Sequence, residues 1–319
     1  MFSAVHGNVP AVGVTTRAGD APSIARSGMA GFTRNTEVLI PLSICALASG
    51  SSGNAILVRS ENTCVLVDSG ISARVIEDRL DRLGIAPDSL AGIFITHAHA
   101  DHYRTAGTMH VRHGIPIYLD PSTEGAIRTR GCRISWRKVR ETRPIPESVG
   151  DLQVRALDTS HAADGRTVAY RFTHRSRSVA VATDLGMVPQ SLLDGLRGVD
   201  ALLLEANYDA PTIRRKLCDR RFSPSWEYLN WVESERGHLS NDQCAAALRE
   251  ILTGPEARVL LGHVSENHRR PDQNNNHWMT AEDTVRLAFQ RAGHRPPHLH
   301  RTYRSGIDPG RASDVITLG

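Results

Sequence analysis

Residues 97–102 read HAHADH and place three histidines and one aspartate in six positions, directly after the apolar run at residues 92–96. Imidazole and carboxylate groups together suit zinc, manganese or iron. The other explanation is a polar turn with a helix-capping aspartate, but three histidines so close together favour a metal site. The end of a rigid strand can aim such side chains at one point. The sequence therefore predicts a metal centre here.

Three more residues with metal-binding side chains follow strand-like runs: His161 in DTSHAA, Asp184 in VAVATDLG and His263 in VLLGHVS. A lone histidine is more often a core or surface residue than a ligand, so each of them indicates little alone. With the first motif they form a set of seven. A closed structural zinc site needs four ligands, whereas a catalytic centre often recruits groups from distant loops. The set therefore favours a catalytic centre.

The composition is typical of a soluble globular protein, with 319 residues of which 40% are hydrophobic and 23% charged. The formal charge of +4 permits an anionic partner without requiring one. The five cysteines are odd in number and never in CxxC spacing, which indicates neither a disulfide framework nor a zinc knuckle. No apolar run approaches the ~18 residues of a membrane span. We expect a cytoplasmic protein without membrane association.

The apolar run VLIPLSICALASG, residues 38–50, has the features of a signal-peptide core and cleavage site. It begins far into the chain, however, has a weakly basic flank and continues into a strand-like alternating pattern. We therefore interpret residues 43–48 as a first core strand. Residues 1–40, rich in Gly, Ala, Ser and Thr, are expected to be a disordered leader, and residues 307–319 a tail.

Strand-like and helix-like patterns alternate beyond the leader. Helical spacing of apolar residues is kept from Ile71 to Leu83 and from Ala245 to Leu252. The order of the patterns predicts an α/β fold with mixed sheets covered by helices. The predicted strands are residues 43–48, 55–60, 63–68, 92–96, 115–119, 152–157, 167–173, 178–183, 200–205 and 257–262.

The HxHxDH motif, a later lone histidine, an aspartate after an apolar strand and a late histidine together resemble the metallo-β-lactamase superfamily. The resemblance covers about residues 42–305 and includes VLVDSG, whose Asp68 matches the early aspartate near the metal centre of that family. It implies a hydrolase domain at residues 41–306, folded as an αββα sandwich of two mixed β-sheets flanked by helices. A dinuclear site would lie at one edge.

The resemblance also implies which residues bind two divalent ions, zinc or manganese. Asp184 would bridge the ions, and Asp68 would lie just behind the ligands. Asp184 stands where the best-known zinc β-lactamases have cysteine, which disfavours β-lactam hydrolysis. The implied ligands are His97, His99 and His161 for the first ion, and Asp101, His102 and His263 for the second.

Four further segments resemble the YycJ/WalJ branch of bacterial hydrolases and, less closely, tRNase Z and the PhnP-like cyclic phosphodiesterases. Members of that branch are regarded as nuclease-like, and DNA exonuclease activity has been proposed for some. The resemblance thus implies a nuclease, with DNA as the favoured substrate. The segments are LASGSSGNA (47–55), SHAADG (160–165), LLLEANYD (202–209) and GHLSNDQCAAAL (237–248).

Phosphodiester hydrolysis near neutral pH needs a hydroxide nucleophile and charge neutralisation on the phosphoryl oxygens. Two metals about 3.5–4 Å apart supply both through a bridging hydroxide. The leaving alkoxide also needs a proton, for which His238 is our candidate general acid, oriented by Glu205 as in the pair of tRNase Z. Asp101 is expected to serve catalysis as well as metal binding. Alternatively, His238 decorates the helix beginning near Asn241 and Glu205 is a buried strand-end carboxylate.

Two basic runs, residues 128–143 and 214–226, interleave Arg and Lys with aromatic residues such as Trp136 and Trp226. This composition suits phosphate contacts combined with base stacking, although a charge run is usually just a solvated face. The candidate nucleic-acid contacts are Arg128, Arg130, Arg137, Lys138, Arg214, Arg215 and Lys216.

The sequence therefore predicts a cytoplasmic dinuclear metallohydrolase, a phosphodiesterase that acts on nucleic acid in the manner of a DNA exonuclease. One alternative is a hydrolase of small cyclic phosphodiesters, esters or thioesters, for which the basic runs would be irrelevant. The other is a metal-binding regulatory protein without turnover. Salt-dependent DNA binding would separate the first two.

Overall fold

The structure is a computed structural model that describes residues 42–130, 134–265, 274–304 and 311–318. The expected leader, residues 1–40, lies outside the described residues. None of the helices in these ranges is both long enough and apolar enough to cross a membrane.

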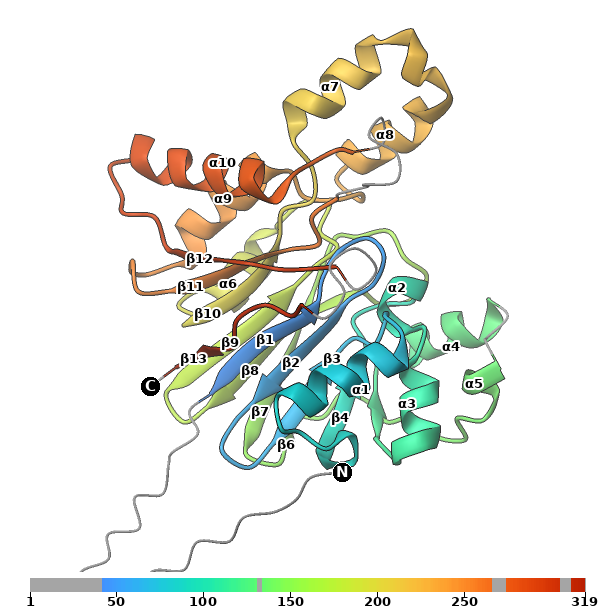
Figure 1. Ribbon diagram of the computed structural model, residues 1–319. Coiled ribbons are helices and arrows are strands. Elements are labelled where there is room, and N and C mark those ends of the chain that lie inside the picture. The colour runs from blue at the N-terminus through green and yellow to red at the C-terminus, as the bar shows by residue number, and fades with distance from the viewer. Residues whose placement is uncertain (1–41, 131–133, 266–273, 305–310, 319) are drawn as a thin grey trace, which may run out of the picture. The chain divides into compact units, whose positions relative to one another are not determined.

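Six strands in the described ranges form the first sheet, in the order β13-β1-β2-β3-β4-β5 (Figure 1). All six side chains of β1 are buried, so the apolar run at residues 43–48 is a core strand as predicted. The pairs β3–β4 and β4–β5 are parallel, which brings the ends of β3 and β4 to one edge. The strands are β1 Ser43–Ala48, β2 Ala55–Arg59, β3 Cys64–Val67, β4 Leu90–Phe94, β5 Ile117–Tyr118 and β13 Ile316–Thr317.

The second sheet has seven strands within the described part of the chain, in the order β12-β11-β10-β9-β8-β7-β6. The strands β9 to β12 are parallel to one another, so their carboxyl ends share one edge. The strands are β6 Ser148–Val149, β7 Leu152–Asp158, β8 Val168–His174, β9 Arg177–Ala182, β10 Ala201–Glu205, β11 Arg258–Gly262 and β12 His298–Arg301.

The sheets pack face to face, and helices cover their outer faces, which is the expected αββα sandwich (Figure 1). Ile44, Phe94 and Tyr170 belong to the apolar core between the sheets. The helices beside the first sheet are α1 Ala73–Arg82, α2 Ala100–Tyr103, α3 Ala106–His113, α4 Pro121–Thr129 and α5 Ile134–Arg137, with the short η1 Pro87–Ser89. Those on the second sheet are α6 Gln190–Leu196, α9 Asn241–Ile251 and α10 Trp278–Arg291.

Both helices predicted from apolar spacing are present. In α1, Ile76 and Leu80 lie one turn apart and are buried against the first sheet. The helix α9 begins with a capping box, in which Ser240 and Gln243 each bind the other's backbone N–H.

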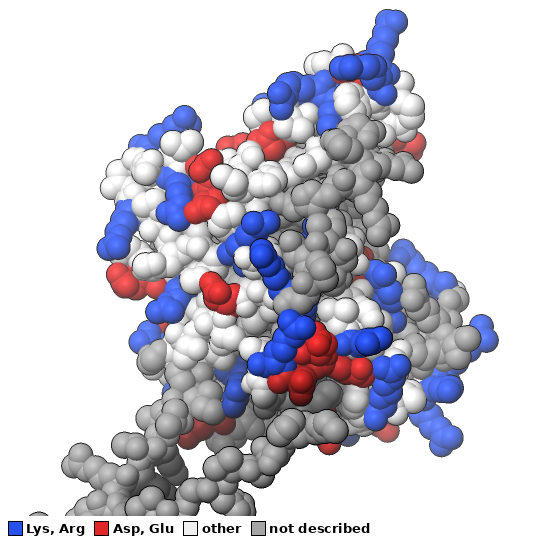
Figure 2. All heavy atoms as spheres, in the orientation of Figure 1, with Lys and Arg blue, Asp and Glu red and all other residues white. Residues whose placement is uncertain are grey.

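Residues 210–233 form a helical arm between β10 and α9, made of α7 Ala210–Cys218, η2 Arg220–Ser225 and α8 Trp226–Glu233. The arm has a small apolar cluster of its own, which includes Ile213, Leu229 and Val232. In Figure 1 it projects beyond the sheets. Lys and Arg side chains gather over the arm, at the top of Figure 2, and over the region of α4 and α5.

Three of the described strands are not predicted from the sequence: β6, β12 and β13. The polar segment HLHR of β12 shows no apolar alternation, and β13 is only two residues long. The expected tail is therefore wrong in part, because Ile316 is buried and pairs with Ile44 of β1. The Ala46 N–H also donates to Ser313 Oγ at 2.8 Å.

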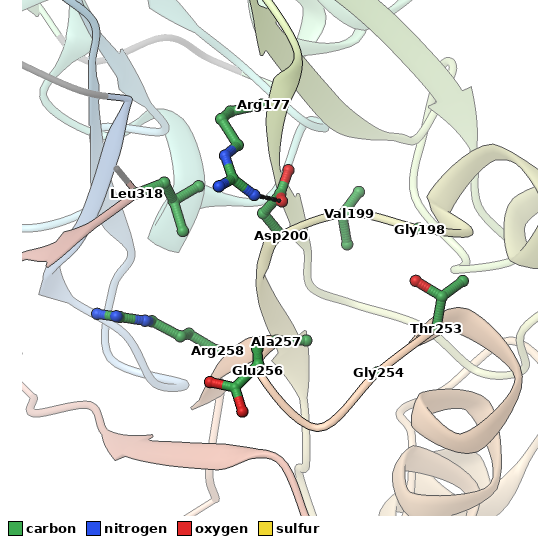
Figure 3. A pocket seen from close by; sticks show the side chains of 10 residues that line it. All are labelled: Arg177, Gly198, Val199, Asp200, Thr253, Gly254, Glu256, Ala257, Arg258 and Leu318. Atoms are coloured by element: carbon green, nitrogen blue, oxygen red, sulfur yellow. Dashed lines mark hydrogen bonds and ion pairs between the residues drawn. The ribbon is translucent and has the colours of Figure 1, made fainter.

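A pocket of about 260 Å³ lies at the amino ends of β9, β10 and β11 (Figure 3). Its charged side chains include Arg177 and Asp200, which form an ion pair of 2.7 Å with each other. The pocket is at the edge of the second sheet opposite to the residues predicted to bind metal, so it is not their site.

Candidate metal centre

Several of the residues predicted at the centre follow the carboxyl ends of strands in both sheets. Asp68 follows β3, Asp184 follows β9 by two residues, and His263 follows β11 directly. All three have a positive φ, of 62°, 56° and 50°, in the left-handed region that non-glycine residues rarely adopt. Such backbone strain clusters at functional sites, where the surrounding structure fixes it. Here it turns the strand-end side chains toward a common centre.

The first group of donor atoms belongs to His97, His99, His161 and Asp184, and all of them lie within 4.8 Å of one another. His99 Nδ1 is 3.0 Å from His97 Nε2 and 3.2 Å from His161 Nε2. Asp184 Oδ1 is 3.6 Å from His161 Nε2. Three imidazole nitrogens and a carboxylate oxygen therefore face one point.

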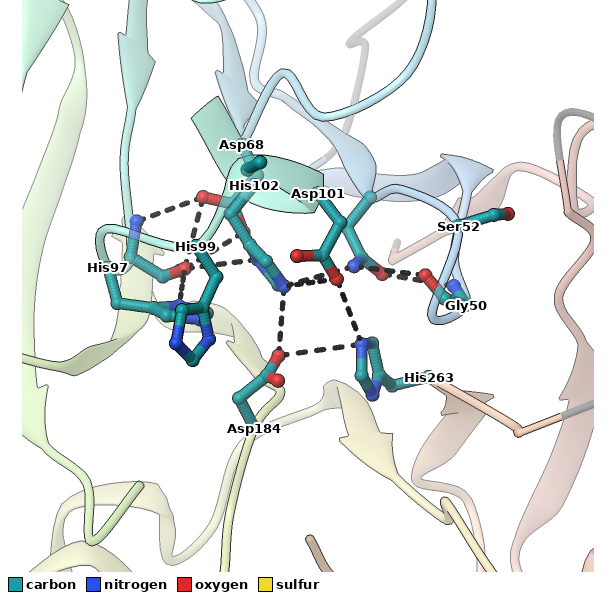
Figure 4. A network of polar contacts seen from close by, with 12 residues as sticks. Gly50, Ser52, Asp68, His97, His99, Asp101, His102, Asp184 and His263 are labelled. Carbon is teal, nitrogen blue, oxygen red and sulfur yellow. Dashed lines mark hydrogen bonds and ion pairs between the residues drawn. The ribbon is translucent and has the colours of Figure 1, made fainter. Parts of the chain in front are cut away.

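The second group consists of Asp101, His102 and His263, again within 4.8 Å (Figure 4). Asp101 Oδ2 is 3.5 Å from His102 Nε2 and 3.6 Å from His263 Nε2. The other oxygen of Asp184, Oδ2, faces this group, at 3.0 Å from His102 Nε2 and 3.7 Å from His263 Nε2. The Asp184 carboxylate thus lies between the two groups.

The histidine ring nitrogens that face away from the centre are held by hydrogen bonds. Such outer partners fix the ring orientation and keep the inner nitrogen free for a metal. The anchors are Gly237 O for His161 Nδ1 at 2.6 Å, Asp68 Oδ2 for His102 Nδ1 at 2.7 Å, and Glu205 Oε1 for His263 Nδ1 at 3.1 Å.

Asp68 lies behind His102, as the resemblance implies. Besides the His102 ring, its carboxylate accepts hydrogen bonds from the Thr96 N–H at 2.9 Å and from the Thr96 hydroxyl. Asp68 is fully buried. It therefore orients the imidazole and the start of the HAHADH loop.

Carboxylates around the second group favour the protonated, positively charged form of its two histidines. Burial alone would lower the pKa of His102, but the carboxylates of Asp184, Asp68 and Asp101 outweigh burial and raise this pKa well above its usual value. The pKa of His263 is likewise raised to about 10, against the effect of burial, by Asp184, Asp101 and Glu205. The centre is thus electrostatically suited to a cation.

The histidines of the first group show the opposite trend. Burial, with the neighbouring imidazoles, lowers the pKa of His97 well below its usual value and that of His99 to about 4. Burial also lowers the pKa of His161. Neutral imidazole is the form that binds metals, so these three rings are suited to that role near neutral pH.

Two buried polar atoms at the centre, Asp184 Oδ2 and His263 Nε2, have no hydrogen bond of normal geometry among the described residues. Buried polar groups are normally satisfied, and buried carboxylates need a compensating charge. A divalent cation would meet both requirements. Imidazole nitrogens with carboxylate oxygens are a donor set for zinc or manganese. The residues present therefore fit a divalent metal site.

The expected pair of His238 and Glu205 is brought together beside the two groups. His238 Nδ1 donates to Glu205 Oε1 at 2.8 Å, which leaves His238 Nε2 available. Glu205 is fully buried and also accepts from the backbone N–H groups of Leu185 and Leu239, at 2.5 and 3.3 Å. His238 is buried as well, so it does not merely decorate the surface of a helix.

The basic residues proposed from the sequence differ in position. Arg130 lies near the HAHADH loop, where it donates to the Ala98 carbonyl at 3.2 Å and pairs with Asp164 at 2.6 Å. Arg128 pairs with Glu124 of its own helix at 2.7 Å. Both of these arginines are exposed, as are Arg137, Lys138, Arg214 and Arg215.

Two expectations about the basic runs need correction. Lys216 is buried, and its Nζ donates to Asn274 O at 2.8 Å and to Asn275 Oδ1 at 3.0 Å, so its charge supports the fold. Trp136 is completely buried, with its Nε1 donating to Tyr103 O at 3.2 Å, so it offers no surface for base stacking. The apolar sides of these segments pack inward and leave only part of each run at the surface.

Several residues around the centre are not among those predicted from the sequence. Asn54 Nδ2 is 3.2 Å from His102 Nε2, and Asn207 Nδ2 is 3.1 Å from His263 Nδ1. Single polar residues have no periodic signal, although both lie in segments that carried the resemblance. Trp231 and Tyr228 of the arm also approach the centre. They are three residues apart on one helix, and this i, i+3 spacing would have predicted that their side chains are neighbours.

Comparisons with known proteins agree with this fold and site. A family model described as a β-lactamase superfamily domain matches residues 63–264. Exodeoxyribonuclease WalJ of Streptococcus pneumoniae (serotype 2, strain D39) is 30% identical over 225 residues, which cover 70% of this chain and 81% of WalJ. Exodeoxyribonuclease YycJ of Bacillus anthracis is 27% identical over 225 residues, 70% of this chain and 83% of YycJ.

Among solved structures, the metallo-β-lactamase fold protein YhfI from Bacillus subtilis has a TM-score of 0.57 at 16% identity, and the match covers 86% of this chain and 99% of YhfI. At this identity the likeness concerns the fold alone.

Proposed function

The chain belongs to the metallo-β-lactamase superfamily, in the branch of WalJ and YycJ, and we propose that this metal-dependent hydrolase is a two-metal phosphodiesterase that degrades DNA as an exonuclease. The observation that carries the proposal is the position of the Asp184 carboxylate. One of its oxygens faces the first group of donor atoms and the other faces the second, at 3.6 Å from His161 Nε2 and 3.0 Å from His102 Nε2.

This geometry supports a dinuclear centre with Asp184 as the bridge. Two divalent ions held there, zinc or manganese, would activate a water at neutral pH and neutralise the phosphoryl oxygens of a diester. Asp101 has a partly exposed carboxylate between the second-group histidines, which supports its role in catalysis as well as binding. The proposed ligands are His97, His99 and His161 for one ion and Asp101, His102 and His263 for the other.

The leaving oxygen needs a proton, which we assign to His238. Its Nδ1–H is held by Glu205 at 2.8 Å, so Nε2 is the atom from which a proton can be donated. The buried Glu205 carboxylate fixes the orientation of the imidazole ring. Because Glu205 also holds His263, it would couple the general acid to a metal ligand.

DNA is the proposed substrate because the two curated relatives described above are both exodeoxyribonucleases. The exposed arginines of the arm, Arg214 and Arg215, and the exposed Arg137 and Lys138 support contacts with a phosphate backbone. The cysteines that the structure describes, Cys45, Cys64, Cys218 and Cys244, are free thiols, which supports the proposal of a cytoplasmic location.

The test is hydrolysis of end-labelled single- and double-stranded DNA and RNA, with bis-p-nitrophenyl phosphate in parallel, by protein loaded with zinc or manganese. We expect metal-dependent release of nucleotides from DNA ends, lost in Asp184→Ala and kept in Asp194→Ala, a control at an exposed aspartate of α6. Turnover of the small diester alone would replace the proposal with a small-molecule phosphodiesterase. No turnover of any substrate would contradict the proposal altogether.

A further inference from the structure

The arm is inserted directly between two residues of the centre. It begins soon after Glu205 at the end of β10 and returns to His238 through the turn at residues 234–237. Gly237 closes this turn so tightly that a Cβ there would lie 2.1 Å from the Trp231 carbonyl oxygen. The close turn fixes the last part of α8 against the centre.

Trp231 of α8 is the ring through which the arm touches the centre. Its centroid is 5.2 Å from that of His238, in an edge-to-face arrangement with an interplanar angle of 89°. It is also 5.9 Å from the His161 ring. Trp231 therefore lies against both the proposed general acid and a proposed metal ligand.

Tyr228, one turn earlier on α8, continues this series of rings outward. Its ring stacks on Trp231 with centroids 6.0 Å apart and an interplanar angle of 30°. Burial, followed by the Asp101 carboxylate, raises the pKa of Tyr228. Tyr228 is nevertheless 53% exposed, and no other Phe, Tyr or Trp among the described residues is exposed.

We propose that Tyr228, backed by Trp231, is a stacking subsite for the nucleobase next to the scissile phosphodiester. The inference rests on the proposed function and assigns it a substrate class, a polymer whose phosphodiester is flanked by an aromatic base. An exposed tyrosine ring costs little to immobilise and offers a π-face on which any base can stack. A small aliphatic diester or ester would gain nothing from it.

The charge around the rings fits the same substrate. The arm that carries Tyr228 also carries the exposed Arg214 and Arg215 on α7. Basic side chains combined with a stacking ring suit single-stranded nucleic acid and allow binding without sequence preference. The base would stack on the arm while its phosphate lies at the donor groups.

The first experiment compares cleavage of two single-stranded DNA oligonucleotides by the metal-loaded full chain. One is unmodified, and the other carries tetrahydrofuran abasic residues in place of its two terminal nucleotides at each end. Wild-type protein is expected to cut the unmodified ends at least about tenfold faster in kcat/KM, the size of one base–aromatic stacking interaction.

Three variants test whether Tyr228 is the source of this preference. Tyr228→Ala is expected to reduce the ratio of the two rates to near one, whereas Tyr228→Phe, which keeps the ring, should retain it. Asn230→Ala is the matched control, because this exposed residue lies two positions further along α8 and so about 200° around the helix.

A second measurement avoids both metal and turnover. An oligonucleotide with 2-aminopurine at its ends should lose fluorescence on binding to EDTA-treated wild-type protein, because stacking quenches that base, and Tyr228→Ala should abolish this loss. The subsite would be overturned if wild-type protein cuts abasic and unmodified ends at equal rates, or if Tyr228→Ala keeps the wild-type ratio of the two rates. Either result would leave the nuclease assignment intact. If no DNA is cut, the proposed function fails, and absent quenching would then overturn the subsite as well.

Discussion

At the scale of single residues, Glu205 is the side chain on which most of the centre converges. Its Oε1 accepts from His238 and His263, and its Oε2 accepts two backbone N–H groups. The substitution Glu205→Gln keeps the shape of the side chain but removes its negative charge, and the new amide NH2 group must then face N–H donors. We expect metal affinity to fall by about 10- to 100-fold, as for other outer partners of metal ligands. Competition with a chelator of known affinity measures it.

A neighbouring substitution separates proton donation from metal binding. His238→Gln should leave the metal content unchanged but lower kcat on DNA by roughly 10²- to 10⁴-fold, because the leaving alkoxide loses its proton donor. Bis-p-nitrophenyl phosphate should be affected much less, since p-nitrophenolate leaves without protonation. An equal loss on both substrates would exclude His238 as the general acid.

Part of this arrangement of residues has a clear signal in the sequence. The HAHADH motif is recognisable because four donor side chains fall in six positions, and the structure brings all of them to the two donor groups. His161 and His263 are single residues, and only the resemblance to a family links them to the motif. The contact of Glu205 with His263 could not be predicted, because it depends on the register that pairs Glu205 with Gly262 across β10 and β11.

At the scale of elements, parallel strands explain why distant residues meet. The runs that become β9, β10 and β11 can be recognised in the sequence as buried strands. In β10, for example, every residue except Glu205 is apolar. The edge strands β12 and β13 lack such a signal, since edge strands are short and partly polar. The sequence thus predicts the centre of each sheet better than its margins.

The edge strand β13 gives a stability prediction. Ile316 is buried against the core between the sheets, whereas Val315 beside it is 47% exposed. Ile316→Ala should lower the free energy of unfolding by about 2–5 kcal/mol, because less apolar surface is buried and a cavity is left. Val315→Ala should change it by about 0.5 kcal/mol or less. Urea denaturation of both variants is the measurement, and equal effects would mean that β13 does not belong to the sheet.

At the scale of the whole molecule, the proposed function gives the acidic centre and the basic arm different roles in binding DNA. The carboxylates of the centre repel phosphate unless cations are bound, whereas exposed Arg214 and Arg215 attract the backbone at any metal content. Affinity for the polymer and cleavage should therefore respond to different substitutions.

This division predicts a change in salt dependence. In Arg214→Ala/Arg215→Ala, the slope of log K against log salt for single-stranded DNA should become shallower by about 0.7 for each phosphate that the arm no longer neutralises. Fluorescence anisotropy at several salt concentrations measures the slope. The exposed Arg197, which directly follows α6 and pairs with Asp194, provides the control substitution Arg197→Ala. An unchanged slope in the double variant would remove the arm from the DNA-binding surface.

The proposed two-metal hydrolysis of DNA can be tested by a titration of metal-free protein with zinc or manganese, in which bound metal and DNA hydrolysis are measured in the same samples. If two ions are required, hydrolysis develops as the second ion per chain binds, and Asp184→Asn binds at most one ion and does not cleave. Full activity with a single ion, or two bound ions without hydrolysis of DNA, would contradict the proposal.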